Sequence, residues 1–327
     1  MHTILIPTKD RSDFLTRLLS YYKALDWDGM IIIGDSSDGE HFSKAKEYIN
    51  HAGKVLKIKH IDCKGMSIRQ AHEKLLPHIE TEYVCTITDG GFLVPGTINK
   101  CADFLRSHPD YGVASGKGLL VRTENDAVNG KICDITEYAS MPSIEGETAA
   151  QRLTEELSDY GVTVYCVYRS RIWKEIWKES ANIPNRSLSE EVMLCLLTAV
   201  AGKVKRLDDL YMVRQIHNRR TFLPMTFEWI ISPQWHQAYN ECVEVLSRGI
   251  ARKDCVDQES AKEIVSKRFR AFLIRSLANE LPRPVLKNNT ILNNIKRGVR
   301  LVVKRRAQDG YENDLGFIKR SIEGGIK

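Results

Sequence analysis

The stretch 83–97, YVCTITDGGFLVPGT, decides the fold of this chain. It opens with uncharged residues that are mostly β-branched or aromatic, which predicts a buried strand over residues 83–88. The strand ends in Asp89, followed by Gly90 and Gly91, which let a ligand approach the backbone because they carry no Cβ atom. An acid at the carboxyl end of a buried strand lies where open α/β sheets bind ligands, although a plain turn with a solvated Asp89 is the simpler alternative.

The residues around this stretch repeat a strand-then-helix pattern four times in the first 110 residues. The predicted strands cover residues 2–7, 30–34, 55–61 and 83–88, and the predicted helices cover residues 12–22, 42–51, 68–79 and 98–106. This alternation predicts an α/β fold with a Rossmann-like, mostly parallel sheet flanked by helices. Polar residues at three strand ends, Thr8 with Arg11, Asp35 with Ser36, and Asp89, are expected to share one crevice.

The pattern becomes irregular after residue 111. Strands are predicted over residues 113–122, 131–138 and 162–168, with an edge strand over 203–214. Helices are predicted over residues 149–158, 171–178 and 190–201, the last with Ser189 as its N-cap. From about residue 224 the chain is predicted to be helical, including a helix near residues 261–281.

These patterns suggest two regions. Residues 1–222 form the α/β domain, divided into a nucleotide-binding half (1–110) and an acceptor half (111–222), and residues 223–327 form a helical C-terminal region.

Composition limits the classes of protein that fit. The chain has 327 residues, 43% hydrophobic and 28% charged, which excludes a disordered protein. A net charge of +6 does not by itself indicate a nucleic-acid partner, but it suits an anionic ligand or membrane surface. The eight cysteines show no metal-site spacing, no signal peptide opens the chain, and the longest apolar run (192–201) is half a membrane span. We therefore expect a cytoplasmic protein whose membrane contact, if any, is peripheral.

Four segments carry a resemblance to a known family. ILIPTKDRSDFLTRLL, IIIGDSS, ITDGGFLVPGTINKCADFL and SEEVMLCLLTAVAGKVKRLDDLYMVRQIH have the order and spacing of family 2 nucleotide-sugar glycosyltransferases over residues 3–220. The chain most resembles a bacterial subgroup in which an acidic triplet precedes Phe-Leu-Val-Pro. The resemblance implies a GT-A fold and inverting transfer of a sugar from a nucleotide-sugar donor to a hydroxyl of a glycan or lipid-linked acceptor, in bacterial surface polysaccharide synthesis.

The resemblance also implies roles for particular residues. It assigns the nucleotide to Pro7, Thr8, Arg11, Asp35, Ser36, Lys64, Arg69 and Asp89. It makes Glu191, with Glu190 as the alternative, the base that deprotonates the acceptor. It assigns a leaving phosphate to His217, Arg219 and Arg220. Structural roles are open for each: Asp35 capping its own turn, the two glutamates complementing a helix dipole, and Arg69 and the later arginines solvated.

One position departs from the family. Members usually end the fourth strand in Asp-x-Asp, whose last carboxylate holds Mn²⁺ or Mg²⁺ against the diphosphate, whereas this chain has Asp89-Gly90-Gly91. Three explanations remain open: weak metal binding through Asp89 and His217, neutralisation of the leaving group by Lys and Arg without a metal, or an inactive protein. The first two imply a working transferase with weak or no metal dependence, which is the expectation we adopt.

Residues 289–307 combine an apolar stripe with a basic surround, which predicts contact with an inner-membrane surface or, as an alternative, ordinary helix packing. A catalytically silent nucleotide- or sugar-binding module in a glycan assembly complex is the main alternative function. A nucleotidyltransferase is a third, although residues 7–11 contain no glycine for a triphosphate loop.

Overall fold

The computed structural model describes residues 2–138, 142–219, 223–280 and 311–324 of the 327. These residues form one nine-stranded sheet in the order β3-β2-β1-β4-β8-β6-β9-β5, with β7 paired to β6. The strands are β1 (His2–Thr8), β2 (Met30–Asp35), β3 (Lys57–Asp62), β4 (Tyr83–Thr86), β5 (Gly91–Leu93), β6 (Tyr111–Thr123), β7 (Ile132–Glu137), β8 (Val167–Arg169) and β9 (Lys203–Ile216). The predicted α/β class is confirmed.

The N-terminal half of the sheet is parallel. β1 pairs with β2 and β4, and β2 pairs with β3, all in parallel. Ile4, Leu5 and Ile6 in β1 have no exposed surface, because β1 lies inside the sheet with helices on both of its faces. In the register Thr8 lies opposite Asp35, so β1 and β2 end side by side and deliver their polar residues to the same edge.

The second half of the sheet corrects the prediction that residues 203–214 are an edge strand. β9 lies between β6, to which it is parallel, and β5, to which it is antiparallel. The edge is covered because Gly91–Leu93, immediately after Asp89 and Gly90, forms a short strand that the sequence pattern had not indicated. The end of β9 therefore lies against the two glycines of the deciding stretch.

Two further local predictions are wrong. Residues 162–168 form a strand only from Val167, since Thr163–Tyr165 is a 3₁₀ turn closed by Cys166 N–H donating to the Thr163 carbonyl at 2.9 Å. Ser189 does not cap a helix: it lies inside a π-helical turn, Leu188–Val192, that leads into α7. Asn185 takes the capping role, because its Oδ1 accepts the Leu188 N–H at 3.1 Å.

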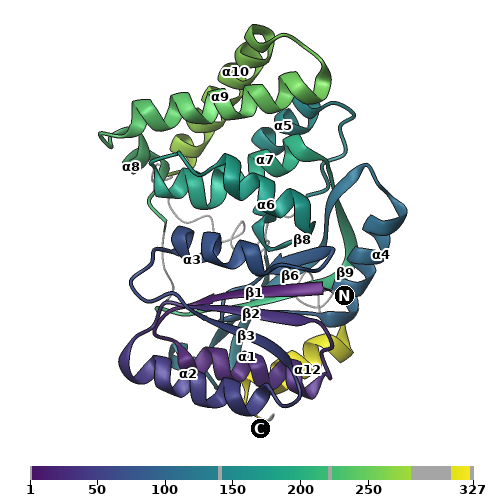
Figure 1. Ribbon diagram of the computed structural model, residues 1–327, viewed down its shortest axis with the longest axis vertical. Coiled ribbons are helices and arrows are strands. Elements are labelled where there is room, and N and C mark those ends of the chain that lie inside the picture. The colour runs from purple at the N-terminus through teal and green to yellow at the C-terminus, as the bar shows by residue number, and fades with distance from the viewer. Residues whose placement is uncertain (1, 139–141, 220–222, 281–310, 325–327) are drawn as a thin grey trace, which may run out of the picture.

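Helices cover both faces of the sheet (Figure 1). They are α1 (Ser12–Ala24), α2 (Gly39–Ala52), α3 (Ile68–Leu75), α4 (Pro95–Ser107), α5 (Ala149–Ser158), α6 (Ser170–Glu179), α7 (Met193–Ala201), α8 (Thr226–Ile230), α9 (Trp235–Asp254), α10 (Gln258–Glu280) and α12 (Glu312–Ile322). α1 and α2 lie on one face of the parallel strands, and α3 and α6 lie on the other.

The C-terminal helices divide between the two ends of the molecule. α9 and α10 pack on α5 and α7, whereas α12, drawn in yellow, packs on α1 and β9 at the opposite end (Figure 1). The Gly130 N–H donates to the Ile322 carbonyl at 2.9 Å, which fastens the end of α12 near β7. Residues 289–307, predicted to contact a membrane, lie outside the described residues.

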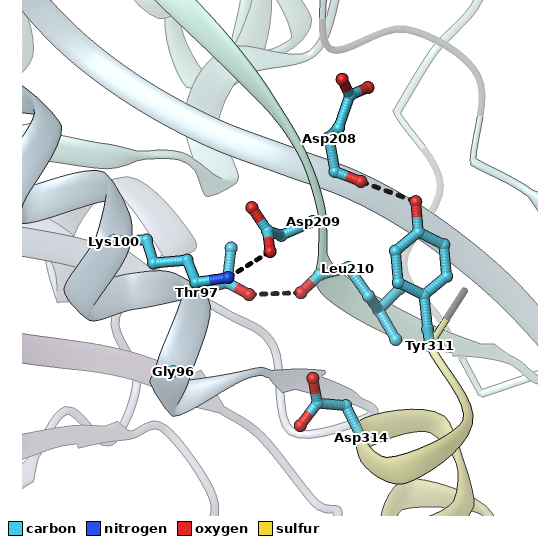
Figure 2. Close-up of a pocket in the computed structure, with 8 residues that line it drawn as sticks. All are labelled: Gly96, Thr97, Lys100, Asp208, Asp209, Leu210, Tyr311 and Asp314. Atoms are coloured by element: carbon cyan, nitrogen blue, oxygen red, sulfur yellow. Dashed lines mark hydrogen bonds and ion pairs between the residues drawn. The ribbon is translucent and has the colours of Figure 1, made fainter.

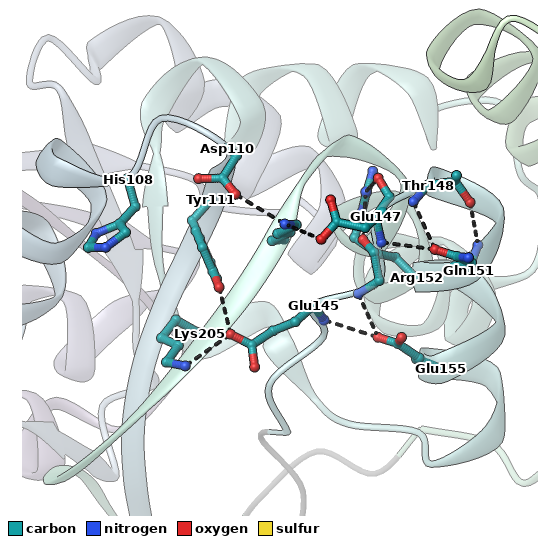
Figure 3. Close-up of polar contacts among 12 residues, drawn as sticks. His108, Asp110, Tyr111, Glu145, Glu147, Thr148, Gln151, Arg152, Glu155 and Lys205 are labelled. Atoms are coloured by element: carbon teal, nitrogen blue, oxygen red, sulfur yellow. Dashed lines mark hydrogen bonds and ion pairs between the residues drawn. The ribbon is translucent and has the colours of Figure 1, made fainter.

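A polar network joins α5 to the sheet, as Figure 3 shows. Glu145 accepts hydrogen bonds from Tyr111 Oη at 2.6 Å and Lys205 Nζ at 2.9 Å. Glu155, on α5, accepts the Glu145 N–H at 3.0 Å. These contacts set the position of α5, against which α7 packs.

Within the described ranges, none of the helices combines the length and apolar character required to cross a bilayer.

Candidate active site

A cavity of about 490 Å³ lies at the carboxyl ends of β1 and β2 and extends between α3, α6 and the turn before α7. Parallel strands of an open sheet bind ligands at this edge. Seven of the predicted site residues line it: Pro7, Thr8, Arg11, Ser36, Glu190, Glu191 and His217. The structure thus brings together residues separated by more than two hundred positions in the sequence.

Asp89 lies just beneath this cavity rather than in its lining. Its carboxylate has no exposed surface, accepts a hydrogen bond from Thr8 Oγ1 at 2.6 Å and pairs with Arg11 Nε at 3.0 Å. Burial raises the pKa of Asp89 more than Arg11 and Thr8 lower it. Asp89 therefore holds the two lining residues of the first loop in place.

Asp35 is a second buried acid behind the lining. Its carboxylate accepts the Ser37 N–H at 2.9 Å and lies 3.2 Å from His60 Nε2. Burial by itself would raise the pKa of Asp35, but the hydrogen bonds from His60 and Ser37 outweigh that effect and lower it. The neighbouring Ser36 lines the cavity. At the end of β2, Ser36 is therefore the residue exposed to the cavity, and Asp35 stabilises the turn behind it.

Glu190 and Glu191 both line the cavity, but their partners differ. Glu190 pairs with Arg186 Nε at 2.8 Å. Glu191 forms no ion pair with any described residue and receives only a long hydrogen bond, 3.5 Å, from Tyr160 Oη. Burial raises the pKa of both carboxyls, against the opposing effects of Arg186 on Glu190 and Arg214 on Glu191. Of the two, Glu191 has the carboxylate free to accept a proton from a ligand.

Arg214 is a lining residue that the sequence analysis did not single out. Its guanidinium lies 4.5 Å from the centre of the Tyr165 ring and 5.6 Å from that of Tyr138. Burial lowers the pKa of Arg214, but the two tyrosines and Glu191 more than compensate, so the group stays charged. The signal that could have found it is a single charge directly after a short apolar run, residues 210–213, near the end of a predicted strand.

His217 lies at the end of β9 beside the deciding stretch. Its ring is buried and stacks on Phe14 with the ring centres 4.5 Å apart. A Cβ atom at Gly90 would lie 3.0 Å from His217 Nε2, closer than side chains ordinarily pack. His217 therefore takes the space that a side chain at position 90 would need.

Three other predicted residues lie outside the cavity lining. Lys64 is exposed on the loop after β3. The Arg69 guanidinium donates to the carbonyls of Trp177 and Ser189 at 2.6 and 3.1 Å. Arg219 pairs with Asp13 at 2.7 Å. Arg69 ties α3 to the chain before α7, a use that a sequence pattern does not reveal.

Arg220, predicted to bind phosphate, lies outside the described residues.

The inner wall of the cavity is aromatic. His72 stacks on Trp177 at 4.5 Å, with Trp173 at its edge. Burial, with a smaller contribution from Arg69, lowers the pKa of His72 to about 4, so this ring is neutral near pH 7. The wall therefore presents flat apolar surface opposite the charged first loop.

Asp89 and His217, the residues predicted to hold Mn²⁺ or Mg²⁺, do not fit a divalent ion in this arrangement. Arg11 Nε and Thr8 Oγ1 both contact Oδ2 of Asp89, so a cation already lies beside this carboxylate, although its Oδ1 has no hydrogen-bond partner among the described residues. Across the described part of the chain, no three His, Cys, Asp or Glu side chains converge as metal ligands do.

A second hollow, of about 350 Å³, lies where α12 meets α4 and β9 (Figure 2). Tyr311 Oη donates to the Asp208 carbonyl and Thr97 Oγ1 to the Leu210 carbonyl, each at 2.6 Å. Lys100 pairs with Asp209. None of the predicted site residues lies here. The Tyr311 contact docks the start of α12 on β9, and the other two fasten α4 to β9.

The parallel half-sheet, the cavity at its carboxyl edge and the helical C-terminal region define a GT-A-like fold. Solved structures with a similar fold include TarS residues 1–349 from S. aureus, with a TM-score of 0.50, 14% identity, and coverage of 82% of this chain and 70% of that one. The longer TarS structure matches with the same TM-score and identity over 82% of this chain and 42% of that one.

A weaker likeness joins this chain to a mannosyltransferase from Pyrobaculum calidifontis, solved with GDP-Man and Mn²⁺. Its TM-score is 0.42 and its identity 11%, over 98% of this chain and 86% of that one. No family model matches the sequence. A search of curated proteins finds no match either.

Proposed function

We propose that this chain is an inverting glycosyltransferase that moves a sugar from a nucleotide-sugar donor to a hydroxyl group of a glycan or lipid-linked acceptor. The observation that carries the proposal is that Glu191 lines the same cavity as the strand-end residues Thr8 and Ser36. Its carboxylate is half-buried and has no ion pair in the described chain. The family resemblance supports the same reaction, and bacterial surface polysaccharide synthesis is the setting it suggests.

In this reaction Glu191 accepts the proton of the acceptor hydroxyl as that oxygen attacks the anomeric carbon. The bond between the anomeric carbon and the donor phosphate oxygen breaks, and its electron pair stays on the phosphate. Burial of Glu191 favours the step, because a carboxylate with a raised pKa is a stronger base near neutral pH. The carboxylate of Glu190 is instead occupied by Arg186, which pairs with it at 2.8 Å.

The nucleotide belongs, in this proposal, at the carboxyl ends of β1 and β2. Pro7, Thr8, Arg11 and Ser36 line that part of the cavity. Arg11 supplies a cation beside the phosphates, held by Asp89 at 3.0 Å. Because Asp89 is matched in this way, we propose that donor binding depends weakly or not at all on a divalent metal.

Donor turnover tests the function. The full chain is incubated with a panel of nucleotide sugars, with and without Mn²⁺, and nucleotide release is measured together with thermal stabilisation by each nucleotide. We expect release and stabilisation with at least one donor, and loss of release but not of stabilisation in Glu191→Gln. Stabilisation without release in both proteins would instead favour a silent nucleotide- or sugar-binding module, the reading that the Asp89-Gly90-Gly91 departure supports.

A lipid-linked acceptor accords with the basic, amphipathic pattern of residues 289–307. We propose that this segment contacts an anionic inner-membrane surface. Co-sedimentation of the full chain with vesicles of anionic phospholipid should exceed that with neutral phospholipid. A variant with five of the six basic residues of the segment replaced by Gln, Lys296, Arg297, Arg300, Lys304 and Arg305, should lose most of the difference.

A further inference from the structure

The two glycines that follow Asp89 each lie under a side chain from the end of β9. Gly91 is the register partner of Arg214, and the Gln215 N–H donates to the Gly90 carbonyl at 2.9 Å. A Cβ atom at Gly91 would lie 2.6 Å from Ile87 Cδ1 and 3.4 Å from Arg214 Cγ. The space in which an acidic side chain at position 91 would begin is therefore already filled by Ile87 and by the stem of Arg214.

The head of Arg214 lies over two tyrosine rings. Its guanidinium carbon is 4.5 Å from the centre of the Tyr165 ring and 5.6 Å from that of the Tyr138 ring, and its Nη1 donates to Tyr138 Oη only at the long distance of 3.5 Å. A guanidinium that packs on aromatic rings keeps N–H groups available for the oxygen atoms of a ligand. The tyrosines therefore position the head of Arg214 and leave hydrogen-bond donors for a ligand.

Arg214 has no carboxylate partner among the described residues. Glu191 lines the same cavity and influences the charge of Arg214, yet no ion pair of 4.0 Å or less joins the two. A half-buried cation that lines a cavity is stabilised when an anion accompanies it. The cavity beside Arg214 is therefore suited to an anionic ligand group.

We propose that Arg214 binds the leaving phosphate of the donor, at the place where an acidic last residue of this motif would hold a divalent ion. The inference rests on the proposed function and names the residue that carries its charge. During transfer the electron pair of the breaking bond between the anomeric carbon and the phosphate oxygen stays on the phosphate. Arg214 stabilises that negative charge by hydrogen bonds, and no proton moves to or from it.

The first experiment measures thermal stabilisation of the full chain by UDP, GDP and inorganic pyrophosphate in EDTA, for the native chain and for Arg214→Gln. We expect the native chain to bind at least one nucleotide in EDTA and Arg214→Gln to bind it at least about tenfold more weakly, the loss expected for a charge-assisted hydrogen bond. Arg206→Gln, on the same strand but outside the cavity, is the matched control and should bind normally. Arg214→Lys keeps the positive charge but lacks the planar, paired N–H donors of the guanidinium. Its nucleotide affinity should lie between those of Arg214→Gln and the native chain.

Each result has a distinct meaning. Equal nucleotide binding by the native chain and Arg214→Gln in EDTA overturns the role of Arg214 and leaves the proposed transferase intact. Nucleotide binding by the native chain that requires added Mn²⁺ would also overturn the role of Arg214 and leave the proposed transferase intact. A native chain that neither binds nor turns over any nucleotide or nucleotide sugar removes the proposed function, and this inference with it.

A second variant covers the case in which Arg214→Gln fails to fold. Gly91→Asp places a carboxylate beside Arg214, and Ile87→Ala in the same protein removes both Cδ1 and Cγ1, which would otherwise lie 2.6 and 2.8 Å from the new Cβ. We expect this double variant to lose nucleotide binding in EDTA at least about tenfold, because the new acid neutralises Arg214, and to recover it with Mn²⁺. Ile87→Ala alone is the control, and unchanged binding of the double variant in EDTA would overturn the inference.

Discussion

Asp89 after β4, which is fully buried, and Glu191 before α7, which is half-buried, are two acids of one candidate site that have opposite surroundings. Burial raises the pKa of both. Asp89 is held by Thr8 at 2.6 Å and Arg11 at 3.0 Å, whereas Glu191 has only a 3.5 Å contact with Tyr160 and faces the cavity. The comparison teaches that burial alone does not make an acid reactive. The neighbouring side chains make the difference. A carboxylate paired with a cation positions other residues of the site, and a carboxylate without an ion pair is available to a substrate.

The largest effect should come from Glu191→Gln. The amide cannot accept the acceptor's proton, so kcat should fall by about 10²–10⁴-fold while donor affinity is kept. Glu190→Gln is the matched control, because Glu190 is already paired with Arg186, and its loss of kcat should be far smaller. Steady-state kinetics with the active donor measures both, and equal losses in the two variants would contradict the assignment of the base.

Asp89→Asn should mainly lower the stability of the folded protein. Removing one partner of a buried ion pair leaves Arg11 with an unmatched charge, which costs about 3–5 kcal/mol of the free energy of unfolding. Urea denaturation should show this loss, together with weaker nucleotide binding as Arg11 and Thr8 lose their anchor. Should Asp89→Asn unfold like the native chain but lose metal-dependent activity, Asp89 would be a metal ligand and not a structural acid.

Glu156, on α5, extends the comparison to a third acid. Its side chain is fully buried, only the Gly161 N–H donates to it in the described chain, at 3.2 Å, and burial raises its pKa from 4.5 to about 8. The pKa of Glu156 is higher in the folded protein than in the unfolded chain. Its contribution to the free energy of unfolding is therefore fully present below pH 4.5 and is lost as the pH rises through about 8.

Over that window the native chain should therefore lose on the order of a few kcal/mol of unfolding free energy from this one group. Glu156→Gln, which cannot ionise, should remove that part of the fall, as urea denaturation at pH 5 and about 8.5 would measure. Glu47→Gln, at an exposed position on α2, is the control and should keep the native slope. An unchanged slope in Glu156→Gln would show that this acid has a partner in solution.

The smallest effect should come from Arg219→Gln. Arg219 pairs with Asp13 at 2.7 Å, but both side chains are more than a third exposed, so the loss should be below about 1 kcal/mol. Nucleotide affinity in the same assay should change little, in contrast to Arg214→Gln. A loss of affinity as large as that of Arg214→Gln would place Arg219 at the phosphates and weaken the distinction between matched and unmatched charges.

Much of this architecture was predictable from the sequence. Apolar runs closed by polar turns located β1, β2, β4 and the helices between them, since the burial of a parallel strand on both faces demands such runs. The position of Glu191 in the cavity agrees with its place in the motif. The helix Ala149–Ser158 was predicted with its observed bounds, because Thr148 and Gln151 form a capping box whose spacing is local.

What only the tertiary structure decided is which charges meet. The side chains of Arg11, Arg69, Arg214 and Arg219 are chemically alike, yet the fold gives them Asp89, backbone carbonyls, two tyrosine rings and Asp13 as partners. The sequence determined the strands, the turns and the acids at their ends, because these follow from local pattern. The pairing of β9 with β5, and with it the place of Arg214 over Gly91, depends on contacts between residues more than a hundred positions apart, which no local pattern encodes.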